Sequence, residues 1–156
     1  MTPDQINALA PGSETDRLVA EAIGKKVETL YAVPPGWTGE REQFAQHYEG
    51  WSTDGYVPVQ KYSTDWSAAM LAAEEFGLFD NDDLGNSVLN KDINEQGSFW
   101  SVCDGDADEP WEAIIAKAST GPMAISLAIL RLHHEAARTT TTPEREVVQN
   151  CTTTAK

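Results

Sequence analysis

The side chains best suited to binding a small ligand are concentrated between Gly36 and Thr64. Aromatic residues are interleaved there with Arg41, His47 and Lys61, in a chain that is otherwise acidic. Aromatic rings stack on nucleobases at roughly 1–3 kcal/mol per base, and arginine and lysine pair with phosphate groups. Thr64 adds a hydroxyl at the expected start of a helix, where free N–H groups favour anions.

This segment therefore predicts a nucleotide-binding site. The predicted ligand-binding residues are Trp37, Arg41, Tyr48, Trp51, Tyr56, Lys61, Tyr62 and Thr64. The alternative interpretation is that the aromatic rings only cover a sheet beneath a long loop.

The patterns that resemble catalytic or metal sites are incomplete. His134-Glu135 begins like the zinc protease motif H-E-x-x-H, but Arg138 stands where the second histidine ligand is required. Asp104, Asp106 and Asp108 alternate like calcium ligands, but the sixth position lacks the glycine and the twelfth lacks the glutamate of an EF-hand. We interpret the histidine as part of a solvated helix end and the aspartates as an acidic turn. The sequence therefore predicts a protein that is not an enzyme and that needs no cofactor or metal.

The charge of the chain excludes several kinds of partner. It has 25 acidic and 11 basic side chains, for a formal net charge of −14. General nucleic-acid binders gain most of their affinity from lysine and arginine that neutralise phosphates, so we expect neither general nucleic-acid binding nor docking on an anionic membrane. The negative charge instead fits a partner with a basic surface, mimicry of nucleic acid, or solubility alone. In the first two cases the turns Asp80–Asp83 and Asp104–Glu109 would make the contact.

The N-terminal half is expected to hold a helix, a strand and a long loop. Ser13, with Asp16 three residues later, has the pattern of a capping box at a helix start. The β-branched and aromatic residues of 27–33 predict a strand. Residues 36–60 are interpreted as an elaborated aromatic loop, with a short helix near 40–48.

A second helix is predicted to begin after Ser63 or Thr64 and to end at Gly77, the residue type that favours the left-handed C-terminal position. Helical spacing predicts that one face of it enters the core. That face carries Trp66, Ala69, Met70, Ala73 and Phe76. Trp100 is also expected in the core.

Three strand-like segments follow, at 87–93, 98–103 and 111–118, joined by short polar connections typical of an antiparallel meander. The third is rich in alanine and fits a helix as well as a strand. The last helix is predicted at 120–137, and it is apolar nearly all round. Such a helix is buried on more than one side, so we expect a sheet and a second subunit to cover it in a homo-oligomer. Residues 139–156 are threonine-rich and are predicted to be disordered.

Three segments together resemble the phage ABA sandwich domain, which is found in small bacteriophage proteins of unassigned function. They are MTPDQINALAPGSETDRLVAEAIG, YSTDWSAAMLAAEE and ASTGPMAISLAILRL. The resemblance implies an α+β fold, an α-β-α sandwich with a mainly antiparallel sheet and three helices, as a single domain over residues 1–138. It supplies no catalytic residues. Segment 36–60 is longer and more aromatic than the family's connection.

These features lead to one functional hypothesis and two alternatives. The leading hypothesis is a non-enzymatic phage accessory protein that sequesters a small nucleotide signal of host antiphage defence. The first alternative is an acidic inhibitor or DNA mimic that acts on a basic host protein, and the second is a virion or assembly component. The N-terminus has no signal peptide pattern, and Cys103 and Cys151 form no close pair. We therefore expect the protein in the host bacterial cytoplasm.

Overall fold

The computed structural model describes residues 1–79, 87–94, 97–104 and 114–139. Within these residues the chain forms four α-helices, one 3₁₀ turn and two three-stranded antiparallel sheets. The helices are α1 (Pro3–Asn7), α2 (Ser13–Ala22), α3 (Trp66–Phe76) and α4 (Gly121–Thr139), the 3₁₀ turn is η1 (Glu42–Phe44), and the strands are β1 (Glu28–Tyr31), β2 (Ala45–Ser52), β3 (Gly55–Pro58), β4 (Ser87–Asn94), β5 (Gly97–Asp104) and β6 (Ile114–Ala118). The α+β class and the antiparallel pairing are confirmed, and the short α1 adds to the three expected helices.

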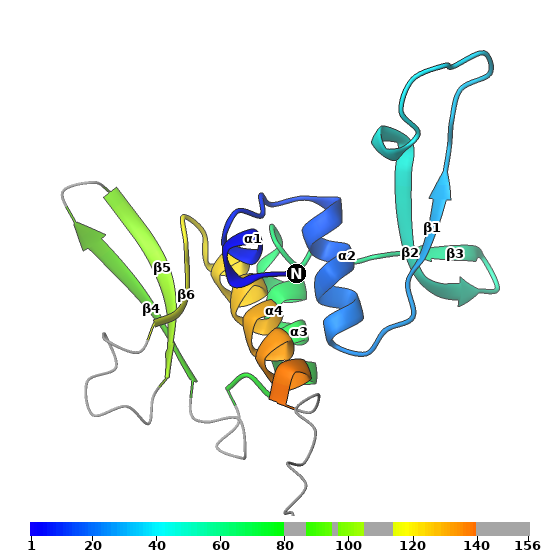
Figure 1. Cartoon of the computed structure of the whole chain (residues 1–156). Coiled ribbons are helices and arrows are strands. Elements are labelled where there is room, and N and C mark those ends of the chain that lie inside the picture. The colour runs from blue at the N-terminus through cyan, green and yellow to red at the C-terminus, as the bar shows by residue number, and fades with distance from the viewer. Residues whose placement is uncertain (80–86, 95–96, 105–113, 140–156) are drawn as a thin grey trace, which may run out of the picture.

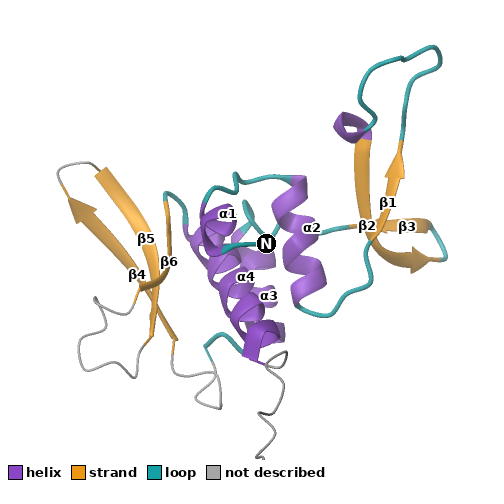
Figure 2. Ribbon diagram, in the orientation of Figure 1, coloured by secondary structure: helices purple, strands orange, loops and turns teal. Residues whose placement is uncertain are grey.

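The order of the layers differs from the expected α-β-α sandwich. Figure 1 shows the helices in the middle, with the β4-β5-β6 sheet on one side and the β1-β2-β3 sheet on the other. Figure 2 shows the same order by element type. The order of the layers differs because β1 belongs to a second sheet. It pairs with β2, from Glu28 opposite Tyr48 to Tyr31 opposite Ala45. Because β1 joins that sheet, it is not a strand of the meander.

Helix α4 is the centre of the core. Every residue from Gly121 to Leu130 is buried, and α1, α2, α3, β5 and β6 all contact the helix. A helix that is apolar on all sides needs such a surrounding, so its predicted burial is confirmed. The covering elements belong to the same chain. This burial therefore does not require a second subunit, and the homo-oligomer stays a prediction.

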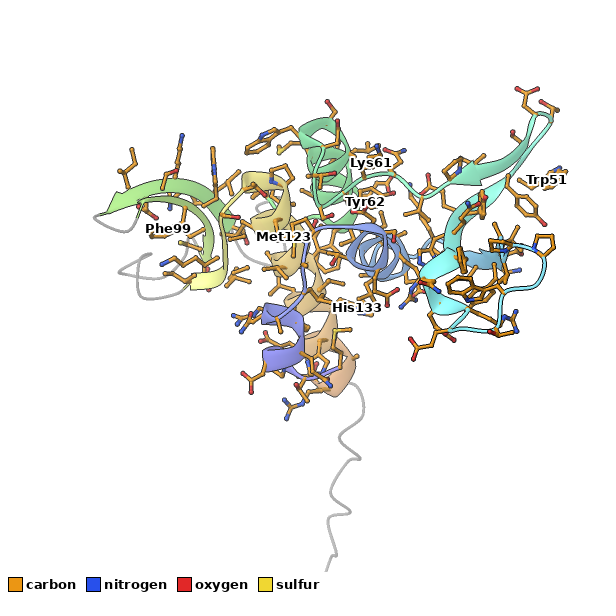
Figure 3. The ribbon with its side chains drawn as sticks, turned by 90° about the horizontal axis from the view of Figure 1, so that it is seen from above. Trp51, Lys61, Tyr62, Phe99, Met123 and His133 are labelled. Atoms are coloured by element: carbon orange, nitrogen blue, oxygen red, sulfur yellow. The ribbon has the colours of Figure 1, made fainter. Side chains whose placement is uncertain are left out.

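Helix α3 packs against α4 through alanines, and Phe76 packs partly buried against the core as predicted, but Trp66 and Met70 lie outside. Ala69 and Ala73 are fully buried, whereas Trp66 is 43% exposed and Met70 is 44% exposed. The expectation that Trp66 and Met70 enter the core is wrong, because the face that contacts α4 is made of small side chains that allow a close approach. Figure 3 labels Met123, at the start of α4, in the middle of the molecule.

The caps of two helices also differ from the predictions. Asp65 caps α3, because its carboxylate accepts a hydrogen bond of 2.9 Å from the Ala68 N–H, so Ser63 and Thr64 are not the cap. Helix α2 begins at Ser13 and has Gly12 as its N-cap, which offers no side-chain acceptor. The predicted C-terminal Gly77 of α3 is confirmed, since its φ is 75°.

The meander is confirmed, and its third segment is a strand over the described part, Ile114–Ala118. Strands β4 and β5 pair without interruption from Ser87 opposite Asp104 to Asn94 opposite Gly97. Val102 of β5 and Ala116 of β6 are buried in the core that includes α4. The sheet is therefore held to the helices by apolar contacts.

Segment 36–60, expected to be mostly loop, contains two strands instead. Strand β2 covers much of the part where a short helix was predicted, and only η1 is helical there. Ser52 and Gly55 face each other across a two-residue turn, and Gly55 has a φ of 115°, which favours glycine. Asp-Gly between strand-like residues is a hairpin signal, although here the two turn residues are Thr53 and Asp54, and Gly55 is the first residue of β3.

Some predictions fall outside the described residues. They concern the Asp80–Asp83 turn, most of the Asp104–Glu109 turn, residues 111–113, and the tail after Thr139. In the described part of the chain, no helix has the length and apolarity needed to cross a membrane.

Candidate functional site

An open pocket lies where the start of α2, the middle of β2 and the turn before α3 meet. It has a volume of about 340 Å³, which is within the range of roughly 300–1,000 Å³ found for small-molecule sites. Its lining residues are Gly12, Ser13, Asp16, His47, Val59, Lys61 and Thr64. Two of the eight predicted ligand-binding residues, Lys61 and Thr64, are among them. We call this the α2 pocket.

The N-terminus of α2 gives the α2 pocket a positive end. The first N–H groups of an α-helix lack intrahelical acceptors, and the helix dipole makes this end attractive to anions. The N-cap Gly12 makes no side-chain cap, and its own N–H donates a 3.0 Å hydrogen bond to Ser63 Oγ. The first turn of α2 therefore opens toward the pocket without a capping side chain over it.

A buried contact between Asp16 and Ser63 holds the turn before α3 against α2. The Ser63 N–H donates to Asp16 Oδ1 at 2.7 Å, and both residues are buried. Burial raises the pKa of the Asp16 carboxyl, while hydrogen bonds from Ser63 and the charge of Lys61 act in the opposite direction. This contact places Lys61 and Thr64 beside the start of α2. Asp16 is thus primarily a positioning residue of the pocket wall.

His47 forms the β2 side of the α2 pocket. Its Nδ1 lies 2.9 Å from Thr29 Oγ1 on the paired strand, which fixes the ring. Its Nε2 lies 3.7 Å from Glu14 Oε2. Glu14 also pairs with Arg17 at 2.6 Å, and this hydrogen bond is the main reason why the pKa of Glu14 is lowered. Arg17 pairs with Glu21 as well as Glu14, so it balances Glu14 only in part. Lys61 and the helix end are the positive groups at the pocket, and Asp16 is the carboxylate in its lining.

Three of the predicted aromatic residues form a separate cluster. The ring centroids of Tyr48 and Tyr56 are 5.0 Å apart, and those of Trp51 and Tyr56 are 4.7 Å apart. Successive residues of a strand point to opposite faces, so Tyr48 points away from the face on which His47 lines the pocket. A bulge between Tyr48 and Gly50 shifts the alternation and brings Trp51 to the same cluster. In Figure 3, Trp51 lies at the far end of its sheet from Lys61.

The other predicted residues lie in two further places. Trp37 packs edge-on against Phe44, with centroids 5.2 Å apart, and the Arg41 guanidinium lies 4.8 Å from the ring centroid of Tyr31. Tyr62 is fully buried. It donates a 3.0 Å hydrogen bond to Glu49 Oε2, so its ring cannot stack on a ligand.

The eight predicted residues therefore do not form one site. The sequence reasoning identified Lys61 and Thr64 but missed the rest of the α2 pocket, namely Gly12, Ser13, Asp16, His47 and Val59. The signal for the helix end was present, because Gly12 directly precedes an acidic first turn. Nothing local in the sequence indicated that this end faces Lys61.

The described residues contain no group of three or more histidine, cysteine, aspartate or glutamate side chains able to hold a metal ion. His133 and His134 line a different pocket, of about 230 Å³, together with apolar residues of α1, α2 and α4. Glu21 also lines that pocket.

Comparisons with known proteins give one distant structural similarity. No protein-family model matches the sequence, and no curated protein matches it. The fold is similar to that of a phage protein from Bacillus cereus ATCC 14579 of known crystal structure, with 16% sequence identity, a TM-score of 0.45, and coverage of 81% of this chain and 94% of the other. A similarity at this level identifies neither a family nor a function, and the resemblance to the ABA sandwich domain stays a prediction.

Proposed function

We propose that this protein binds a small phosphate-bearing ligand, with nucleotides as the ligand class, in the α2 pocket and holds it without chemical change. The observation that supports the proposal is the convergence of the Lys61 side chain, the Thr64 hydroxyl and the start of α2 on one pocket of about 340 Å³. Lysine is a point charge suited to phosphate, and a helix N-terminus supplies N–H donors to the same group. Asp16 and His47 would face the part of the ligand that carries hydrogen-bond donors and acceptors.

The biological role we propose is sequestration of a nucleotide signal of host antiphage defence, by a phage accessory protein in the host cytoplasm. The arrangement of the pocket limits how tightly one chain can bind. Hydrogen bonds to charged groups contribute roughly 1.5–3 kcal/mol each, so three of them would contribute about 5–9 kcal/mol. A Kd of 1 μM corresponds to about 8 kcal/mol and one of 1 nM to about 12 kcal/mol. We therefore expect micromolar affinity, because no phenylalanine, tyrosine or tryptophan of the described residues lines the α2 pocket to add stacking.

Isothermal titration with a panel of mononucleotides and cyclic dinucleotides tests this proposal. Lys61→Met keeps most of the side-chain stem and removes the charge, so it should weaken binding of the best ligand at least tenfold. Trp51→Ala is the matched control, because Trp51 is 72% exposed and does not line the pocket. It should leave the affinity unchanged.

The opposite result would contradict the proposal. If Trp51→Ala abolished nucleotide binding and Lys61→Met did not affect it, the site would be the aromatic cluster. If no nucleotide of the panel bound the wild-type protein, the ligand class would be wrong.

A further inference from the structure

Helix α3 carries an exposed apolar surface that is unrelated to the α2 pocket. Its buried face consists of Ala68, Ala69, Ala72 and Ala73, each 6% exposed or less. Its outer face carries Trp66, Met70 and Leu71, which are 43%, 44% and 40% exposed. A helix with apolar residues on both faces is normally covered on both. Trp66 packs edge-on against Trp100, with ring centroids 5.0 Å apart, so in the described part of the chain Met70 and Leu71 are the apolar side chains of this face that remain open. The outer face is therefore suited to binding another molecule.

This outer face is hollowed into the α3 groove, of about 460 Å³. The lining residues are Ser67, Met70, Leu71, Glu74 and Phe79. Met70 and Glu74 lie one turn apart on α3, and Trp66 lies one turn before Met70, so the three follow one line along the helix. Methionine adapts its shape to an apolar partner.

The charge around the α3 groove is negative. Among the described residues that line it, Glu74 is the charged one. The whole chain carries a formal charge of −14. A second copy of this chain is a poor occupant, because two strongly acidic surfaces would repel each other. A basic partner would be attracted and steered to the groove.

We propose that the α3 groove binds a basic amphipathic helix presented by another protein. The apolar face of that helix would lie on Met70, Leu71 and Phe79, and its lysine or arginine side chains would face Glu74. Laying an amphipathic helix in a hydrophobic groove is a common mode of peptide recognition. This proposal is independent of the α2 pocket, since the two sites share no lining residue.

The probe is a fluorescently labelled 18-residue peptide of leucine and lysine, patterned so that leucine forms one helical face. Its binding to the full-length protein is measured by fluorescence anisotropy at about 150 mM salt, where surface charges are screened beyond about 8 Å. Met70→Ser removes apolar surface without changing the charge, so it should weaken binding at least tenfold. Trp51→Ser removes a more exposed apolar side chain, 72% exposed against 44% for Met70, from the β1-β2-β3 sheet, and it should change the affinity less than twofold.

The thermal unfolding midpoint of both variants should stay close to that of the wild type, because both side chains are exposed. The same peptide with glutamate in place of lysine should not bind. If Met70→Ser bound the basic peptide as well as the wild type does, the attraction would be only a general charge effect and the proposal would be wrong. Failure of the wild type to bind the peptide would also overturn it. Lys61→Met, which tests the α2 pocket, should leave peptide binding unchanged.

Discussion

The two sheets are attached to the helices by different forces. The β4-β5-β6 sheet packs apolar residues, Val102 and Ala116, into the core that contains α4. The β1-β2-β3 sheet contacts α2 through β2, and the side chains at this junction are largely polar. Lys25 Nζ lies 3.5 Å from Glu49 Oε2 and 3.5 Å from Glu75 Oε2, and Glu49 accepts a hydrogen bond from Tyr62.

This difference explains where the candidate site lies. An apolar junction offers few hydrogen-bonding groups to a polar ligand, whereas a polar junction leaves such groups in the space between its elements. The α2 pocket occupies such a space, because His47 and Val59 come from one side of the junction and Gly12, Ser13 and Asp16 from the other. The β4-β5-β6 sheet therefore serves mainly the core, and the β1-β2-β3 sheet serves mainly the site.

The largest expected effect is the loss of folding stability caused by a change in α4, because α4 contacts both the β4-β5-β6 sheet and the other helices. Ile129→Ala removes a fully buried side chain of α4 and leaves a cavity, which costs about 2–5 kcal/mol. Chemical denaturation should show this loss as a single transition, because α4 contacts most of the other elements. If the spectroscopic signal of one sheet were lost at a clearly lower denaturant concentration than that of the other, the two sheets would not share one core.

Tyr62→Phe should affect the two sheets unequally. It removes the hydrogen bond from the buried Tyr62 to Glu49, which leaves a partly buried carboxylate with one donor fewer and costs about 1–3 kcal/mol. Hydrogen exchange should therefore accelerate in β2 more than in β5. Equal acceleration in both strands would show that the hydrogen bond between Tyr62 and Glu49 does not stabilise the β1-β2-β3 sheet more than the other sheet.

The same substitution changes the response to alkaline pH. Burial raises the pKa of the Tyr62 hydroxyl to about 12, above its ordinary value of 10.0. The unfolded chain thus loses this proton first as the pH rises. The stability contributed by Tyr62 is fully present below pH 10 and is lost between pH 10 and about 12. Tyr62→Phe should lack this component in urea titrations over the same range.

Asp16→Asn is expected to have the smallest effect and to change mainly the pH dependence. Burial raises the pKa of Asp16 above 3.8 in the folded protein, so the folded state holds this proton more tightly than the unfolded state does. As the pH rises through this raised pKa, the wild type should lose stability relative to Asp16→Asn. The measurement is the difference in unfolding free energy between pH 3 and pH 6 for the two proteins. A difference of the opposite sign would show that the bonds from Ser63 outweigh burial.

Local patterns in the sequence predicted most elements of the core, but they missed α1 and left the third segment of the meander open between strand and helix. The meander and α4 follow from short polar connections and from an apolar stretch that covers all faces of one helix. The outward orientation of Trp66 and Met70 could not be predicted, because helical spacing places them beside Ala69 and Ala73 without saying which side chains allow the closest packing. The β2–β3 hairpin was predictable from Asp54-Gly55, although the aromatic and charged composition around it favoured a loop.

The candidate site was only partly predictable because it depends on contacts between distant segments. Lys61 and Thr64 are identifiable from their residue types and from the helix that follows them. Their position beside α2 depends on the bond between Asp16 and Ser63, which are 47 residues apart in the chain. No periodicity or motif in the sequence indicates this bond. For the same reason, the assignment of the aromatic cluster and the α2 pocket to opposite faces of β2 required the register of the sheet.

The central claim is that the ligand binds at the α2 pocket and not at the aromatic cluster. Backbone amide shifts in two-dimensional nuclear magnetic resonance spectra test it most directly, during titration with AMP and, separately, with inorganic phosphate. The account predicts that both probes shift the amides of Ser13, Lys61 and Thr64, while those of Trp51 and Tyr56 stay in place. Saturable shifts confined to Trp51 and Tyr56, with Ser13 and Lys61 unchanged, would contradict it.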